Sequence, residues 1–148
     1  MTHGSRYNEN LRTVEIAKLV RQDIKSATKA GLLPVGLGLS VRSERFAGGS
    51  SIDIEVVRMP EGMRVLSAER LALDASGAGA NGTPWASPEA RNIEAVLEGL
   101  MAAYNRDGSD PMTDHYDVKF YGRVQFATAL TIAERDAFMA SWSPAVRS

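Results

Sequence analysis

The chain has 148 residues, which fits a single domain, and 44% of them are hydrophobic, as is typical of a globular protein. Its formal net charge of −1 gives no support for a dedicated, strongly basic polyanion binder. The absence of cysteine excludes disulfide scaffolds, zinc ribbons, iron–sulfur clusters and thiol nucleophiles.

Neither a membrane span nor an export signal is predicted. The longest apolar stretch, residues 31–39, is broken by Pro34 and by glycines and is far shorter than the ~20 residues that a spanning helix needs. Residues 1–10 are polar and lack the apolar core of a signal peptide. We therefore expect a cytoplasmic protein without a membrane partner, and residues 1–12 are predicted to form a flexible tail.

A first helix is predicted from Val14 to Lys29, with Thr13 as its N-cap residue. Its apolar positions recur at about 100° per residue on one side: Ile16, Val20, Ile24 and Ala27. The opposite side carries Lys18, Lys25 and Lys29, flanked by Arg21. These cations are a candidate stripe for phosphate binding, and an ordinary solvated helix face is the alternative.

Residues 37–42 and 52–56 alternate between apolar and polar side chains on either side of the Gly48-Gly49 pair. Period-two alternation around a glycine turn predicts an antiparallel hairpin with one solvated face. The core-facing set is Leu37, Leu39, Val41, Ile52, Ile54 and Val56. This register puts Arg42 and Asp53 on the outer face as direct or diagonal neighbours.

The middle of the chain is less regular. Residues 67–73 are predicted to form a short helix that begins at Ser67. Residues 75–88 carry no charge and are rich in Ala, Gly, Ser and Pro, which predicts a long internal loop with Trp85 packed against the core.

Ser87, Pro88 and Glu89 are a strong helix start, with an N-cap serine followed by proline and a carboxylate in the first turn. An apolar stripe at helical spacing follows: Ile93, Val96, Leu97, Leu100, Met101 and Tyr104. Alternation over residues 116–126 then predicts a third strand. Thr131 and Glu134 predict a capping box that opens a last helix ending near Trp142.

The predicted fold is a single α+β domain over residues 1–148. A small antiparallel sheet, made of the hairpin and the third strand, is expected to have helices packed on one face, in the order α-β-β-(α)-α-β-α. Its outer face would carry Ser40, Arg42, Asp53, Glu55, Lys119, Tyr121 and Arg123. A polar sheet with cations and an aromatic is weakly similar to single-strand RNA platforms, but Asp53 and Glu55 would repel phosphate. An ordinary polar face with an Arg42–Asp53 pair is the alternative.

The densest group of hard metal ligands is the loop that contains Asp107, Asp110, Asp114, His115 and Asp117. Carboxylates and an imidazole are suitable for Mg²⁺ or Ca²⁺, with Asp110, Asp114 and His115 as the weak candidates. The spacing does not match an EF-hand loop, and Asp and Gly serve turns equally well. No metal or cofactor is therefore predicted.

Catalysis has little support in the sequence. Apart from His3 in the predicted tail, His115 is the only imidazole, and no nucleophile elbow, Walker loop or dinucleotide-binding glycine motif is present. No catalytic residue is predicted, and a non-enzyme is expected.

Three segments resemble a known family. They are EIAKLVR at residues 15–21 with Lys25, the pair LSVRS at 39–43 and FAGGSSIDI at 46–54, and SDPMTDHYDVKFY at 109–121. Together they resemble one of the large polyvalent protein-associated α+β domains, which are carried by phages and conjugative elements. The resemblance implies no established activity, but it does imply a role in host takeover or defence evasion.

The expected function is thus a non-enzymatic binding module of a phage or mobile element that acts in the cytoplasm on a host protein or a nucleic acid. The predicted binding residues lie on the first helix and the outer sheet face: Lys18, Arg21, Lys25, Lys29, Arg42, Lys119, Tyr121 and Arg123. The alternatives are a metal-dependent enzyme that uses the Asp107–Asp117 loop and an inert assembly domain.

Overall fold

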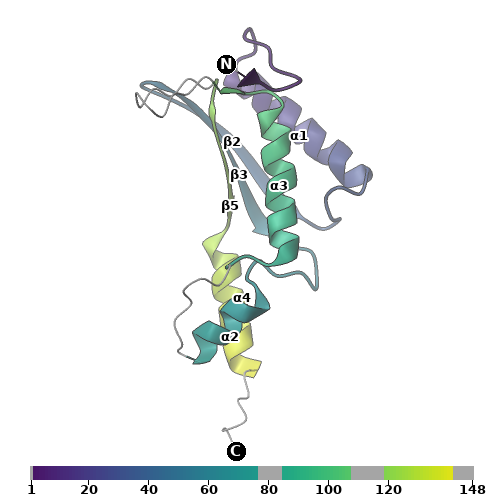
Figure 1. Ribbon diagram of the computed structural model, residues 1–148, viewed down its shortest axis with the longest axis vertical. Coiled ribbons are helices and arrows are strands. Elements are labelled where there is room, and N and C mark those ends of the chain that lie inside the picture. The colour runs from purple at the N-terminus through teal and green to yellow at the C-terminus, as the bar shows by residue number, and fades with distance from the viewer. Residues whose placement is uncertain (1, 77–84, 108–118, 142–148) are drawn as a thin grey trace, which may run out of the picture.

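The computed structural model describes residues 2–76, 85–107 and 119–141 (Figure 1). In chain order the elements are β1 (Thr2–His3), α1 (Thr13–Lys29), β2 (Gly38–Phe46), β3 (Gly49–Arg58), α2 (Ala68–Ser76), α3 (Pro88–Ala102), β4 (Arg106–Asp107), β5 (Tyr121–Phe126) and α4 (Thr128–Ser141). The predicted α+β class and the order of its main elements are confirmed.

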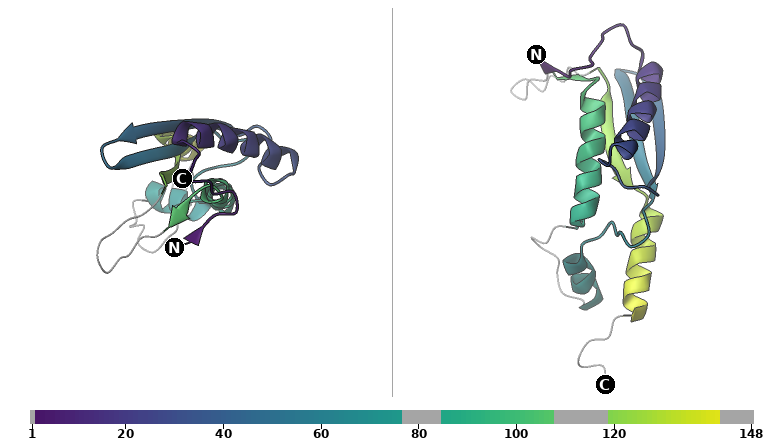
Figure 2. Two further views of the ribbon diagram at one scale, coloured as in Figure 1. Left: turned by 90° about the horizontal axis from the view of Figure 1, so that it is seen from above. Right: turned by 90° about the vertical axis from the view of Figure 1, so that its right-hand side faces the viewer.

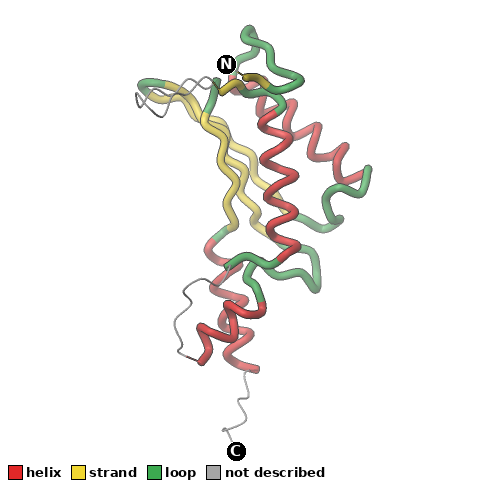
Figure 3. Tube along the Cα trace, viewed as in Figure 1, coloured by secondary structure: helices red, strands yellow, loops and turns green. Residues whose placement is uncertain are grey.

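The main sheet has the strand order β2-β3-β5, and its third strand is not antiparallel as expected. β2 pairs antiparallel with β3, whereas β5 pairs parallel with β3. The reason is the path of α3, which runs back along the sheet (Figure 3), so that β5 starts at the end of the sheet where β3 also starts. The sheet is therefore mixed, and a separate small pair joins β1 to β4.

The predicted hairpin register is confirmed. Val41 lies opposite Ile54, and Arg42 lies directly opposite Asp53. On β3, Ile52, Ile54 and Val56 are fully buried, while Asp53 and Glu55 between them are partly exposed on the other face. The turn depends on Gly48, whose φ of 95° lies in the left-handed region that favours glycine.

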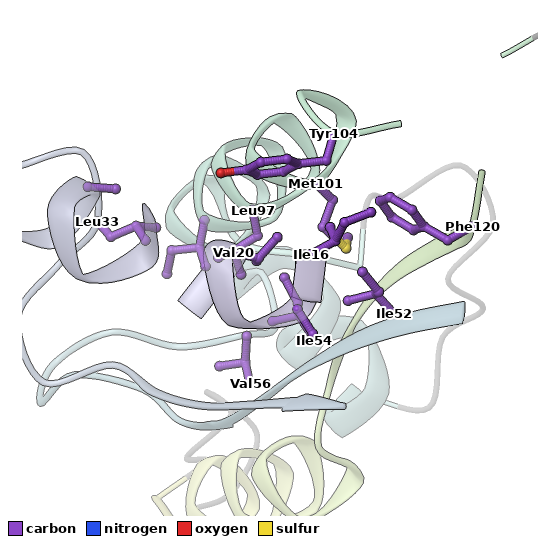
Figure 4. Packing of buried hydrophobic residues seen from close by; sticks show 13 residues of the cluster. Ile16, Val20, Leu33, Ile52, Ile54, Val56, Leu97, Met101, Tyr104 and Phe120 are labelled. Carbon is purple, nitrogen blue, oxygen red and sulfur yellow. The ribbon is translucent and has the colours of Figure 1, made fainter. Parts of the chain in front are cut away.

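Helices α1 and α3 lie side by side on one face of this sheet (Figures 1 and 2). The core between the two layers is made of aliphatic side chains from both helices and from β3, closed at one end by Phe120 (Figure 4). In the described part of the chain, no helix covers the opposite face of the sheet. Period-two alternation on β3 therefore separates a buried face from an open one.

The predicted helix starts are partly confirmed. Ser87 Oγ accepts the Ala90 N–H at 3.0 Å at the start of α3, and Ser67 Oγ accepts the Arg70 N–H at 3.0 Å at the start of α2. At α1, however, Thr13 is not the N-cap. Its hydroxyl lies 2.6 Å from Ser50 Oγ of β3, and the helix is capped one residue earlier.

The start of α1 has Arg12 as its N-cap residue, which pairs with the carboxylate of Glu15. The Arg12 N–H and Nε both donate to Glu15 Oε1, at 3.2 and 3.0 Å. This salt bridge lowers the pKa of Glu15, because the guanidinium hydrogen bond favours the charged carboxylate.

The capping box predicted at Thr131 and Glu134 is wrong, because α4 begins one turn earlier and both residues lie within it. The Glu134 carboxylate instead accepts two backbone N–H groups, from Val65 at 2.7 Å and from Leu66 at 2.8 Å. It thereby satisfies two backbone donors of a buried segment that the bridge between Leu66 and Ala86 does not use. This contact ties α4 to the turn region beyond the lower end of the sheet, where α2 also packs (Figure 1).

Residues 1–12 are predicted to be a flexible tail, but the part from Thr2 to Arg6 is held in place by the pairing of β1 with β4 and by backbone hydrogen bonds next to the end of α3. The Gly4 N–H donates to the Asn105 carbonyl at 2.8 Å, and the Arg6 N–H donates to the Ala103 carbonyl at 2.7 Å. The Ala103 carbonyl belongs to the C-cap of α3, where backbone acceptors have no partner within the helix, and Asn105 lies in the turn that follows. A Cβ at residue 4 would collide with the same helix end, so this close approach requires glycine.

Only part of the predicted 75–88 loop can be compared, because residues 77–84 lie outside the described residues. Residues 75–76 end α2, and Ala86 pairs with Leu66 in an isolated bridge. The Trp85 ring packs edge-on against Phe126, which itself packs against the core, with ring centroids 6.2 Å apart. Trp85 is nevertheless 45% exposed, so it borders the core from the surface.

Within residues 2–76, 85–107 and 119–141, no helix combines the length and the apolar character that crossing a bilayer would require.

Shortening one side chain on each face of β3 tests this register. Ile54→Ala is expected to lower the free energy of unfolding by roughly 2–5 kcal/mol, because it opens a cavity in the core. Asp53→Ala is expected to cost less than about 1 kcal/mol, because its partner Arg123 is largely exposed. Urea denaturation followed by circular dichroism measures both, and equal losses would contradict the assignment of the two faces.

Candidate functional site

A polar cluster fixes α1 against α3. Arg6 Nη1 donates to both carboxylate oxygens of Asp23, at 2.8 and 3.0 Å, and to the Tyr104 hydroxyl oxygen at 2.9 Å. The Tyr104 hydroxyl in turn donates to Asp23 Oδ2. Burial, and next the hydrogen bond to the Asp23 carboxylate, raise the pKa of Tyr104. The cluster joins the N-terminal segment, α1 and α3, so it determines which side of α1 remains outward.

The four cations predicted on this helix are all exposed: Lys18, Arg21, Lys25 and Lys29. Arg21 differs from the others because its Nη2 donates to the Val41 carbonyl of β2 at 2.6 Å. The predicted stripe is therefore present, and one of its members reaches the sheet.

Three of the four cations line a groove of about 540 Å³ between α1 and β2, which we call the cationic groove. Its residues are Arg21, Ile24, Lys25, Thr28, Lys29, Leu37, Leu39 and Val41. No acidic residue is among them, and Lys18 lies outside the lining. Cations thus form its rim and aliphatic side chains form its floor.

The apolar floor of the cationic groove follows from the position of β2 at the edge of the sheet. Leu39 and Val41 face the same side as the fully buried Val56 and Ile54 opposite them. They are only half-buried, because in the described chain no strand pairs with the far side of β2. The same apolar alternation that builds the core therefore reaches solvent at this edge.

The outer face of the sheet has a different character. Arg42, Asp53 and Arg123 form one row across β2, β3 and β5. The Asp53 carboxylate pairs with Arg123, at 3.2 Å from Nε, and not with Arg42 as the alternative interpretation expected. Exposed pairs of this kind contribute little to stability.

A second aromatic joins Tyr121 on this face. The rings of Phe46 and Tyr121 are stacked with centroids 6.1 Å apart and planes at 27°, and the residues are 46% and 45% exposed. The sequence interpretation missed Phe46, although the signal was there. Continuing the outer-face positions Ser40 and Arg42 by steps of two leads to residue 46 at the hairpin turn.

The predicted binding residues do not form one surface. The α1 cations lie on the helix-covered side of the sheet, and Arg42, Tyr121 and Arg123 lie on the open side. Lys119 belongs to neither group, because it precedes β5. Its Nζ donates to the Glu9 carbonyl at 2.9 Å and lies 5.9 Å from the centre of the Tyr7 ring, so it helps to hold the N-terminal segment.

The candidate metal ligands Asp110, Asp114 and His115 lie outside the described residues, as does Asp117. Asp107 is in β4. Within the described ranges, no group of three or more potential ligands is arranged to hold a metal ion. Metal binding by this loop stays an untested prediction.

No protein-family model, curated protein or solved structure matches this chain. The two surfaces themselves, and chiefly the cationic groove, therefore carry the evidence for a function.

Tyr104→Phe tests the cluster that holds α1. The loss of the hydroxyl is expected to lower the free energy of unfolding by about 1 kcal/mol at neutral pH. Because the pKa of Tyr104 is raised in the folded state, its contribution is complete below the ordinary tyrosine pKa of about 10 and is lost as the pH rises through the higher folded value.

The unfolding free energies of wild type and Tyr104→Phe should therefore converge in strongly alkaline buffer. An absorbance titration of tyrosinate gives an independent check, since the signal that the variant loses should appear above the ordinary tyrosine pKa of about 10. If the lost signal instead lies at that ordinary pKa, the environment of Tyr104 does not favour its neutral form and the proposed role of the cluster is wrong.

Proposed function

We propose that this protein is a non-enzymatic binding module of a phage or mobile element that acts in the cytoplasm and docks an acidic, partly apolar segment of a host protein in the cationic groove. The observation that carries the proposal is the lining of that groove. It combines three cations with four aliphatic side chains and contains no carboxylate. The mobile-element and cytoplasmic parts are supported by the resemblance of the hairpin and its neighbours to polyvalent protein-associated domains.

The apolar floor favours a protein partner over a nucleic acid. Phosphate contacts need cations alone. Covering aliphatic side chains with an apolar surface, by contrast, contributes roughly 25 cal/mol of binding free energy per Å² of apolar area removed from water. An exposed ion pair contributes only ~0–1 kcal/mol. The floor would therefore supply most of the affinity, and the rim of Arg21, Lys25 and Lys29 would select acidic partners and speed their association.

Two synthetic probes test this docking. The extended probe is a nine-residue peptide in which every second residue is threonine. The positions between the threonines alternate between valine and glutamate. The helical probe is a longer peptide that carries leucine and glutamate on one helical face. Fluorescence anisotropy measures their affinity at low and high salt, and versions with lysine in place of glutamate are the charge controls.

We expect at least one acidic probe to bind, and the triple change Arg21→Gln, Lys25→Gln, Lys29→Gln to weaken that binding at least tenfold. Lys18→Gln is the matched control, because it removes a cation of the same helix that lies outside the groove. Its effect should stay within about twofold. If neither acidic probe binds, or if the lysine probes bind equally well, the proposed function is wrong.

Single-stranded nucleic acid at the open sheet face is the second candidate. The stacked pair of Phe46 and Tyr121 favours it, because single-strand binding proteins stack bases on exposed aromatic rings. Arg42 lies on the same face, but so do Glu44 and Glu55, and Arg123 is already paired with Asp53. The local charge therefore gives this face no cationic excess.

A gel-shift experiment with oligo-dT, oligo-U and a DNA duplex at low salt separates the two candidates. The groove proposal expects no shift of any of them. A single-strand shift that Tyr121→Ala reduces about tenfold, as the loss of one stacking contact predicts, would assign function to the sheet face instead. A duplex shift that Lys18→Gln weakens as much as Lys25→Gln does would indicate phosphate binding along α1.

A further inference from the structure

We infer that the partner segment binds in an extended conformation, as an additional strand on the free edge of β2. This inference rests on the proposed function and specifies the form of its ligand. β2 is nine residues long and forms one edge of the sheet, and no strand in the described chain pairs with its outer side. It lies directly beside the cationic groove, whose floor includes its residues Leu39 and Val41.

The hairpin geometry determines which backbone groups of β2 face outward. Residues Ala47 and Gly48 form a two-residue turn closed by Phe46 and Gly49, and in such hairpins the closing pair is hydrogen-bonded. Antiparallel pairing then alternates, so every second residue of β2 bonds to β3 and those between point away. The outward set is Leu39, Val41, Ser43 and Arg45.

The contact from α1 agrees with this alternation. The Val41 carbonyl accepts a hydrogen bond from Arg21 Nη2 at 2.6 Å, as an acceptor on the free side of the strand can. Edge strands usually have their pairing blocked by a bulge, a proline or a very short length. From Leu39 to Phe46 the register of β2 is regular, and its one irregularity lies between Gly38 and Leu39. An exposed arginine therefore occupies an edge that is otherwise able to pair.

Strand addition would exchange the partners of Arg21 without leaving a polar group unsatisfied. A backbone N–H of the incoming segment takes over the Val41 carbonyl, and the released guanidinium pairs with a carboxylate of the segment in a charge-assisted hydrogen bond. Side chains of a strand alternate between its two faces. One face of the segment would therefore carry the valines that cover Leu39 and Val41 and the glutamates that reach Lys25 and Lys29.

Backbone N-methylation of the extended probe tests this directly with wild-type protein. One modified probe is N-methylated at its valine and glutamate positions and the other at its threonine positions. Since alternate N–H groups of a strand point to opposite sides, only one pattern blocks hydrogen bonds to β2. We expect one pattern to weaken binding at least tenfold and the other to change it by no more than about twofold.

The pattern that fails also reports the orientation. If N-methylation at the valine and glutamate positions abolishes binding, the added strand is antiparallel, because the residue opposite Val41, on the same face, then exchanges hydrogen bonds with it. If N-methylation at the threonine positions abolishes binding, the added strand is parallel. Amide hydrogen exchange gives a second readout. With the probe bound, the Val41 and Ser43 amides should exchange about tenfold more slowly, while the Arg42 and Glu44 amides, already paired with β3, should not change.

Failure of this inference can be distinguished from failure of the proposed function. If both methylated probes lose affinity equally, or neither does, while the triple glutamine change still weakens binding, the groove is the site but the ligand is not an added strand. Binding of the helical probe alone would likewise overturn strand addition and leave the groove in place. If no acidic probe binds, both fail.

Discussion

The alternation of side chains along β3 is the constraint on which the rest of the structure depends. This strand has a partner on each side, so its backbone is paired along most of its length, and only its two faces remain to be defined. Ile52, Ile54 and Val56 point toward α1 and α3 and are fully buried, which forces Asp53 and Glu55 to the opposite face. A shift of one residue would bury two carboxylates and expose three core side chains, so the register of β2 and β5 is fixed by the same choice.

Features with a local physical signature could be predicted from the sequence. The hairpin register follows from period-two alternation, and the start of α3 follows from Ser87 and Pro88. The direction of β5 has no such signature, because it depends on α3 crossing back along the sheet. The same holds for Glu134, whose carboxylate satisfies backbone donors nearly seventy residues earlier in the chain. Polar side chains near a helix start predict a cap only when no distant donor competes for them.

The candidate site shows the same division. Lys25 and Lys29 could be placed on the solvent side of a helix from their spacing, but the groove they border could not be foreseen. It exists because β2 is an edge strand, and strand order is a property of the whole fold. Lys119 shows the converse, since alternation extrapolated backward from β5 assigned it to the sheet face, while its amine in fact reaches the Glu9 carbonyl.

The cations around the free edge of β2 also bear on how copies of this protein avoid one another. An unprotected edge strand is a template for pairing with the same strand of a second molecule, which is a route to aggregation. In such a pair, the Arg21, Lys25 and Lys29 of one copy would lie close to those of the other, and the repulsion between like charges would oppose contact. The rim that we propose attracts a carboxylate-bearing strand would thus also disfavour self-association, so the same charges would select the partner and reject a second copy. Because salt screens exposed charges, concentrated electrolyte weakens this protection, and the chain should be most soluble as a monomer in dilute buffer.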